Sequence, residues 1–235
     1  VVAKHLYGGL GQNLFNPAMV AYVVVLICFP QVMALWLPPS SIAGQSLSLG
    51  EILTTIFSGH LPAHLSWDAI SEATPLDTIR ASLATGRMVS EARMSPVFGS
   101  FGGLGWEWIA NFYALGGLWL LWRRIISWHV PVMMIGSVVG LGLVAYLADP
   151  GSNPAPLQHV FSGALILGAF FIATDPVTGC DSTRGRLIFG AGVGILTLVI
   201  RRWGAYPDGV AFAVLLMNMA APLIDRYTRP RIFGQ

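Results

Sequence analysis

The sequence predicts an all-α protein, a polytopic membrane helix bundle with interrupted helices. Hydrophobic residues make up 54% of the chain and charged residues only 10%, whereas soluble domains carry about 25% charged residues. The 27 Gly and 15 Pro suit helices that pack through small residues and helices that break at membrane depth. The net charge of +2 is too small to indicate a nucleic-acid partner, so the expected surroundings are the lipid bilayer.

Apolar runs long enough to cross a hydrocarbon core of about 30 Å recur along the chain. We expect six membrane-spanning segments, at residues 19–37, 104–122, 129–147, 158–174, 187–200 and 208–224. Pro30 is expected to kink the first segment. Trp residues near both ends of the second follow the pattern of an aromatic belt.

This pattern divides the chain into four parts. They are a Gly-rich start with one membrane helix (1–37), a long outer loop (38–103), five membrane helices (104–224) and a tail (225–235). Within the loop, residues 51–57 are too few to span a membrane and predict an amphipathic surface helix. Because the chain begins without Met, we expect a piece of a longer protein whose first segments are missing.

The distribution of Lys and Arg predicts the orientation in the membrane. Alternating connections place on one side Lys4, Arg123, Arg124, Arg184, Arg186, Arg226, Arg229 and Arg231. The other side receives Arg80, Arg87, Arg93, Arg201 and Arg202. The first side is expected to be cytoplasmic, which puts the 38–103 loop on the periplasmic side of a bacterial inner membrane. The Arg201–Arg202 pair runs against this rule.

A polar stretch at residues 68–77 stands out in the long loop. Thr74 carries a hydroxyl flanked by a small residue and stiffened by Pro75, which makes it a candidate for chemical modification. The alternative is an ordinary exposed turn.

Asn13 and Asn16 precede the first apolar run in a Gly-rich segment. Amide side chains are costly in lipid unless they face protein or a ligand. One interpretation makes them caps of the first helix, and the other makes them the lining of a ligand site at a broken helix.

Two acids at the ends of predicted spans, Asp175 and Asp225, are candidates for an ion pathway, because carboxylates near hydrocarbon are expensive. The alternatives are an Asp175-Pro176 turn and an ion pair of Asp225 with Arg226 or Arg229. No cysteine or histidine spacing predicts a metal site.

A short internal echo links residues 4–9 with residues 158–163, both of which lead into a helix. Under the predicted topology the two copies enter the membrane from opposite faces. That arrangement is typical of an inverted repeat, with a binding site between the halves.

Four stretches carry motifs of one known family: residues 4–18 (KHLYGGLGQNLFNPA), 71–76 (SEATPL), 173–178 (ATDPVT) and 221–225 (APLID). Together they resemble the D subunit of the Rnf electron transport complex and the related B subunit of the sodium-translocating NADH:quinone reductase. The resemblance covers essentially the whole chain and matches the C-terminal two-thirds of the family.

The resemblance implies that Thr74 carries FMN through a phosphoester bond, because it ends a motif like Ser/Thr-Gly-Ala-Thr that starts at Ser71. Glu72 stands where the motif has Gly, and an acid there repels an incoming phosphate. Arg80 is expected to offset the phosphate charge. The resemblance also implies riboflavin held without a covalent bond, with Asn13 and Asn16 as its hydrogen-bonding residues.

The sequence therefore predicts a membrane electron-carrier subunit of an ion-translocating ferredoxin:NAD oxidoreductase. It would exchange electrons with other Rnf subunits, including a flavoprotein G-type subunit on the outer side, coupled to Na⁺ or H⁺ transport. The chain itself has no dinucleotide-binding fingerprint. The alternatives are a subunit of the quinone-reducing relative and a solute channel or transporter without a redox role.

Overall fold

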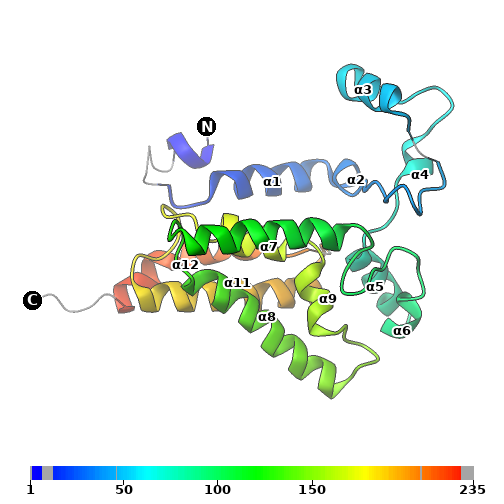
Figure 1. Cartoon of the computed structure of the whole chain (residues 1–235). Coiled ribbons are helices and arrows are strands. Elements are labelled where there is room, and N and C mark those ends of the chain that lie inside the picture. The colour runs from blue at the N-terminus through cyan, green and yellow to red at the C-terminus, as the bar shows by residue number, and fades with distance from the viewer. Residues whose placement is uncertain (1, 7–12, 46, 207, 229–235) are drawn as a thin grey trace, which may run out of the picture.

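The computed structural model describes residues 2–6, 13–45, 47–206 and 208–228, and this part of the chain is built from helices joined by loops (Figure 1). Its only strand-like pairings are isolated bridges, such as the one between Trp36 and Glu72. The predicted all-α class is confirmed.

Four long helices form the body of the molecule (Figure 1). They are α7 (Trp106–Trp122), α8 (His129–Ala148), α11 (Thr183–Trp203) and α12 (Val210–Thr228). Each overlaps a predicted span. Among the described residues, α8, α11 and α12 are long and apolar enough to cross a membrane.

The first predicted span is not one helix. Helix α1 (Pro17–Cys28) ends at Phe29, and the short α2 (Pro30–Met33) follows it. Pro30 lacks an N–H group and restricts the residue before it, and Phe29 accordingly leaves the helical region with φ −132° and ψ 56°. The expected kink at Pro30 is confirmed as a break, and the expectation of a helix running to residue 37 was wrong.

The fourth predicted span, 158–174, is also interrupted. It consists of α9 (Pro156–Phe161), α10 (Leu165–Leu167) and the π-helical turn η2 (Gly168–Ile172). Gly163, between α9 and α10, has φ +67°, which strains any residue with a Cβ. The predicted span at 158–174 is therefore one of the interrupted helices that the sequence predicts.

Shorter helices α3 (Leu49–Ser58), α4 (Trp67–Ile70), α5 (Pro75–Ala84) and α6 (Val89–Ala92) lie at one end of the bundle (Figure 1). We call residues 47–103 the outer lobe. Helix α3 confirms the predicted surface helix, and a capping box between Ser48 and Glu51 starts it. The segment η1 (Val2–Leu6) lies toward the opposite end. Residues 7–9 lie outside the described residues, so the internal echo stays a prediction.

Hydrogen bonds join the outer lobe to two connections between helices of the bundle, at Gly151 and at residues 204–205. The N–H of Val89 donates to the carbonyl of Gly151 at 2.9 Å. Arg80 donates from its two terminal nitrogens to the carbonyls of Gly204 and Ala205, both at 2.6 Å.

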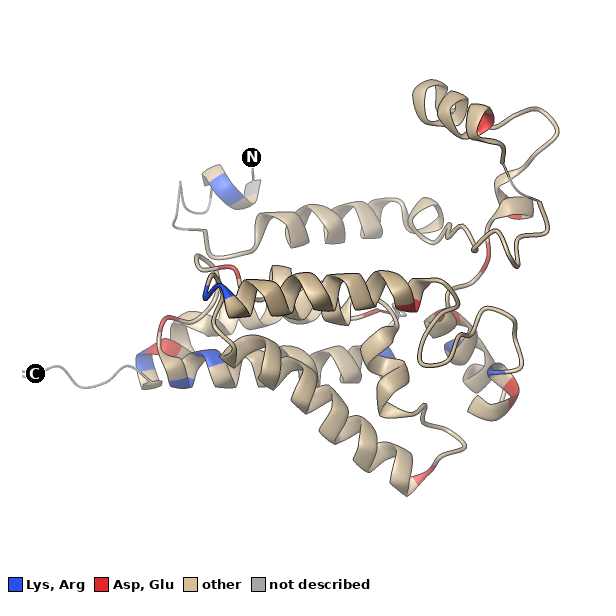
Figure 2. Cartoon of the chain, viewed as in Figure 1, with Lys and Arg blue, Asp and Glu red and all other residues tan. Residues whose placement is uncertain are grey.

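Charged residues lie mainly toward the two ends of the bundle and the middles of the long helices are uncharged, as a membrane protein requires (Figure 2).

Helices α8 and α11 pack closely because glycine lines their contact. The buried side chains of Met134, Val138, Phe189 and Val193 belong to the core around it. A Cβ added to Gly194 would lie 2.5 Å from the carbonyl oxygen of Met134 and closer still to the Ser137 hydroxyl. Close backbone approach through small residues is a common way for membrane helices to associate.

We therefore expect Gly194→Ala to lower the thermal stability of the detergent-solubilised protein, by about 1–3 kcal/mol, because overpacking forces the helices apart. Gly140→Ala on α8 is the matched control, since a Cβ there meets nothing within 4 Å. Fluorescence-detected size-exclusion chromatography after heating measures both. Equal midpoints for the two variants would contradict this packing.

Candidate functional site

Thr74 starts helix α5 as its N-cap residue, with φ −67° and ψ 159°. Its hydroxyl donates to a carboxylate oxygen of Asp77 at 2.6 Å and accepts from the N–H of Asp77 at 3.2 Å. Pro75 occupies the first helical position, where a missing N–H costs nothing. Local sequence rules therefore fix the half-buried Thr74 hydroxyl at the end of a helix.

The helix N-terminus has an electrostatic consequence for Thr74. Unpaired backbone N–H groups and the helix dipole favour negative charge there. A phosphate attached to the Thr74 oxygen would be stabilised by both, although it would have to share the position with the Asp77 carboxylate.

Thr74 lies on the wall of a cavity of about 600 Å³. Helices α1 and α2 form one side and α7 the other, with residues 72–77 at the lobe end. Residues 161–164, 166, 167, 208, 210 and 211 are also in the wall. The wall is mostly apolar, and its aromatic residues are Tyr22, Trp36, Trp106, Tyr113, Phe161 and Tyr206. Pockets that bind cofactors and drug-sized ligands have volumes of about 300–1,000 Å³ and a mostly apolar lining, and this cavity fits both descriptions.

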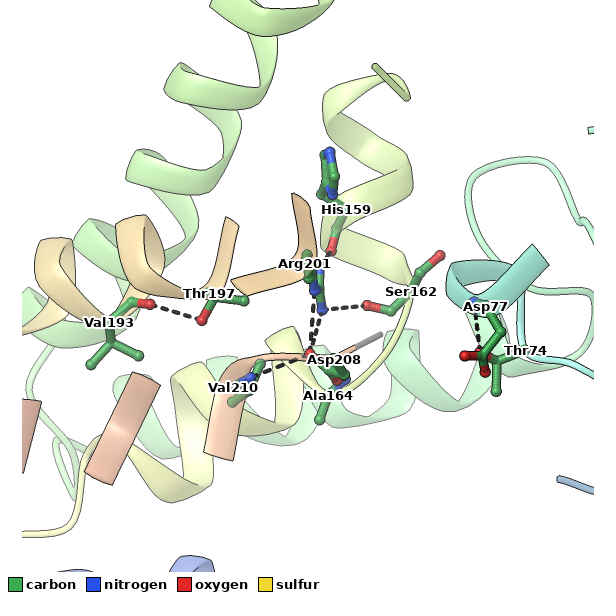
Figure 3. Close-up of polar contacts among 10 residues, drawn as sticks. All are labelled: Thr74, Asp77, His159, Ser162, Ala164, Val193, Thr197, Arg201, Asp208 and Val210. Atoms are coloured by element: carbon green, nitrogen blue, oxygen red, sulfur yellow. Dashed lines mark hydrogen bonds and ion pairs between the residues drawn. The ribbon is translucent and has the colours of Figure 1, made fainter. Parts of the chain in front are cut away.

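The cavity wall also includes the break between α9 and α10. Arg201 donates to the carbonyls of His159 at 2.6 Å and Ser162 at 3.0 Å. Asp208 accepts from the N–H of Ala164 at 2.7 Å, and it pairs with Arg201 at 3.1 Å (Figure 3). The cation thus satisfies carbonyls where α9 ends, and the carboxylate satisfies an N–H where the chain resumes toward α10.

The other two predicted residues near Thr74 do not face the cavity. Ser71 ends α4 and is not among the described residues that line the wall. Arg80, expected to pair with an anion, uses two of its five N–H donors for the Gly204 and Ala205 carbonyls. It fastens the outer lobe to the α11–α12 connection. The exposed Glu72 is at the cavity wall, and its backbone N–H donates to the carbonyl of Trp36.

At the far end of α1, the two predicted asparagines behave differently. Asn16 is the N-cap of α1, and its side-chain oxygen accepts from the N–H groups of Ala18 and Met19. The capping interpretation is therefore right for Asn16. Asn13 is also buried, but its side-chain oxygen has no hydrogen-bond partner within the described residues. An unsatisfied buried amide requires an explanation.

Asn16 also joins a polar cluster that sequence reasoning did not assemble. Its side-chain nitrogen donates to Asp175 at 3.4 Å, and its N–H donates to the side-chain oxygen of Asn218 at 3.1 Å. Asn218 is only 1% exposed and donates to the carbonyl of Thr178 at 3.0 Å. The fold thus brings Asn16, Asp175 and Asn218 together from three separate elements.

The candidate acid Asp175 is also part of a turn. Its carboxylate accepts from the N–H of Val177 at 3.1 Å and from the hydroxyl of Thr178 at 2.9 Å. The turn expected as the alternative at Asp175-Pro176 is therefore present, and the contact with Asn16 comes in addition.

The other candidate acid, Asp225, is buried in α12 and accepts from the N–H groups of Asp181 and Ser182 just before α11. In the part of the chain that the structure describes, it makes no ion pair with Arg226, and Arg229 lies outside those residues. Asp225 thus stabilises the turn that leads into α11.

Arg201, Asp208 and Asn218 are the site residues that sequence reasoning missed. The charge pattern marks Arg201 only as an exception to the orientation rule. Its charge is neutralised within the fold by Asp208, which lies seven residues further along, across the α11–α12 connection. The signal that could have indicated this pair is a basic residue at the end of one predicted span and an acidic residue at the start of the next.

These features define a helical membrane protein with an apolar cavity between interrupted helices and a capped hydroxyl at its wall. A family model described as "NQR2, RnfD, RnfE family" matches residues 1–234. The chain belongs to this family.

Similar curated relatives include proteins named as the D subunit of an ion-translocating oxidoreductase complex. The one from Vibrio cholerae serotype O1 is 52% identical over 241 residues, and the one from Aeromonas hydrophila is 49% identical over 241 residues. The one from Yersinia pseudotuberculosis is 51% identical over 242 residues. In each case the match covers 100% of this chain and 69% of the relative.

The loop that precedes α11 holds a buried thiol, Cys180. Burial, the nearby Asp225 and then Asp181 raise the pKa of Cys180 to about 12. At pH 8 only about one thiol in 10⁴ is then a thiolate, which is the reactive form.

We expect Cys180 in a Cys28→Ser background to resist iodoacetamide at pH 8 until the protein is denatured, with mass spectrometry as the readout. Rapid alkylation of the folded protein would contradict this environment.

Proposed function

We propose that this chain is the D-type membrane subunit of an Rnf complex and relays electrons through FMN attached to Thr74. The observation that carries the proposal is the Thr74 hydroxyl, placed both at the N-terminus of α5 and at the wall of a flavin-sized apolar cavity. When bound, a flavin supplies one- and two-electron transfer, and the protein supplies position and electrostatics.

The residues around Thr74 fit such a group. The N-terminus of α5 favours the phosphate of a phosphoester, and the aromatic residues of the wall offer faces for a flat ring. The nearby carboxylate of Asp77 would have to give up its hydrogen bond from the Thr74 hydroxyl, because the esterified oxygen carries no proton.

A second flavin, riboflavin, is proposed at the far end of α1. The support is the buried side-chain oxygen of Asn13, which has no hydrogen-bond partner among the described residues, three positions before Asn16 and its contacts with Asp175 and Asn218. Amide groups of this kind suit the hydrogen-bonding edge of a flavin ring. Asn16 can take part only through donors that its capping role leaves free.

We further propose that the outer lobe faces the periplasm across a bacterial inner membrane, where a G-type flavoprotein subunit exchanges electrons with Thr74-bound FMN. The relatives' names, which say ion-translocating and oxidoreductase, support membership of a multi-subunit complex. The pairing of Arg201 with Asp208 weakens the exception to the predicted orientation, since the Arg201 charge is balanced inside the fold.

Coupling to Na⁺ or H⁺ is proposed to involve Asp175 and Asp225. Both carboxylates already have hydrogen-bond partners, so a cation would have to compete with Thr178 at Asp175 and with backbone N–H groups at Asp225. The relatives' names, which say ion-translocating and oxidoreductase, favour this function over a solute channel without a redox role.

Thr74→Ala tests the covalent site, because the substitution removes the only atom that can carry the phosphoester there. Denatured protein from flavin-replete cells is expected to fluoresce on a gel under ultraviolet light, and the variant is expected to be dark. Thr78→Ala, one turn further along α5, is the matched control and should remain fluorescent. A dark wild-type band, or a fluorescent Thr74→Ala band, would refute the assignment.

Asn13→Leu tests the second flavin, since leucine has a similar volume but no hydrogen-bonding group. We expect the variant to lose most of the flavin that acid extracts from the purified protein, while the in-gel fluorescence persists. Asn111→Leu on α7 serves as the control for changing an amide in a membrane helix. Unchanged extractable flavin in Asn13→Leu would argue against this site.

A further inference from the structure

The Arg201–Asp208 pair stabilises the break between α9 and α10, and it also lies next to the cavity at Thr74. Asp208 lines the same cavity as Thr74, together with Ser162, Gly163 and Ala164. The Arg201 side chain is only 3% exposed, against 24% for Asp208, and Arg201 is not among the described residues that line the cavity. The Asp208 carboxylate therefore lies at the cavity wall, and the Arg201 guanidinium lies behind it, on the side away from the cavity.

The backbone at the break is shaped around this pair. A Cβ on Gly163 would lie 2.5 Å from a carboxylate oxygen of Asp208 and 2.9 Å from a terminal nitrogen of Arg201. Gly163 also has φ +67°, so glycine is required there for two separate reasons. The two charges thus lie against the main chain at the cavity wall, where they cannot easily change distance.

Fixed charges at the edge of a mostly apolar cavity act more strongly on a redox group inside it than they would in water, because the surroundings have a lower dielectric constant. Flavin gains electrons on reduction and is anionic in its reduced form near neutral pH. A nearby carboxylate therefore opposes reduction and a nearby cation favours it. In the intact pair the two effects partly cancel.

We propose that Arg201 and Asp208 are positioning residues that set the reduction potential of the flavin tethered at Thr74. The inference rests on the proposed function of Thr74, and it adds the part of the protein that tunes that flavin. Neutralising the two partners is then expected to move the potential in opposite directions.

The test is a spectroelectrochemical titration of the purified, flavin-loaded protein. The redox transition that is missing from Thr74→Ala protein identifies the tethered flavin. Asp208→Asn leaves the cation uncompensated and should raise the midpoint potential of that transition. Arg201→Gln leaves the carboxylate uncompensated and should lower it, and the double variant should return close to the wild type.

Matched controls separate this effect from a general change in charge. Arg202→Gln removes the neighbouring, exposed cation, and Asp149→Asn removes an exposed carboxylate at the turn after α8. Both should leave the potential where it is. A merely structural role for the pair would lower thermal stability in both single variants without moving the potential in opposite directions.

Neutralising one partner of a buried pair can also prevent accumulation of the protein. Asp208→Glu and Arg201→Lys keep the charges but move them relative to the wall, so each should still shift the potential. Potentials that are unchanged in every variant that accumulates, or that shift in the same direction for both partners, would overturn the inference. Loss of in-gel fluorescence in the wild type would instead refute the tether at Thr74.

Discussion

The ion pair between Arg201 and Asp208 makes the interrupted crossing possible. A break inside a membrane helix exposes carbonyls on one side and N–H groups on the other, and lipid satisfies neither. Arg201 binds carbonyls where α9 ends, and Asp208 binds the Ala164 N–H ahead of α10. Removing one partner of such a buried pair typically costs about 3–5 kcal/mol. The cavity beside Thr74 depends on this arrangement, because the break forms part of its wall.

Elements set by local rules could be predicted from the sequence. Thr74-Pro75 defines the start of α5, Pro30 breaks the first membrane segment, and long apolar runs define α8 and α11. Features that depend on distant contacts could not. Arg201 and Asp208 meet only because α11 and α12 turn back on one another, and the partners of Arg201 at His159 and Ser162 lie about 40 residues away in the chain.

The same limit applies to the expected roles of single residues. Arg80 is a basic residue near Thr74 and was therefore expected to bind an anion, yet it donates to two backbone carbonyls of the α11–α12 connection. Asn13 and Asn16 look alike in sequence, and only the fold separates a helix cap from a buried amide without a described partner. Residue type indicates the chemistry, and tertiary contacts decide where that chemistry is used.

The fastening of the outer lobe by Arg80 has a consequence for the conditions under which the protein works. Both acceptors are main-chain oxygens, so the contact contains no carboxylate that acid could protonate. An ion pair in the same place would weaken as acid protonated its carboxylate or as salt screened it. The lobe should therefore stay attached to the bundle when pH and salt concentration change.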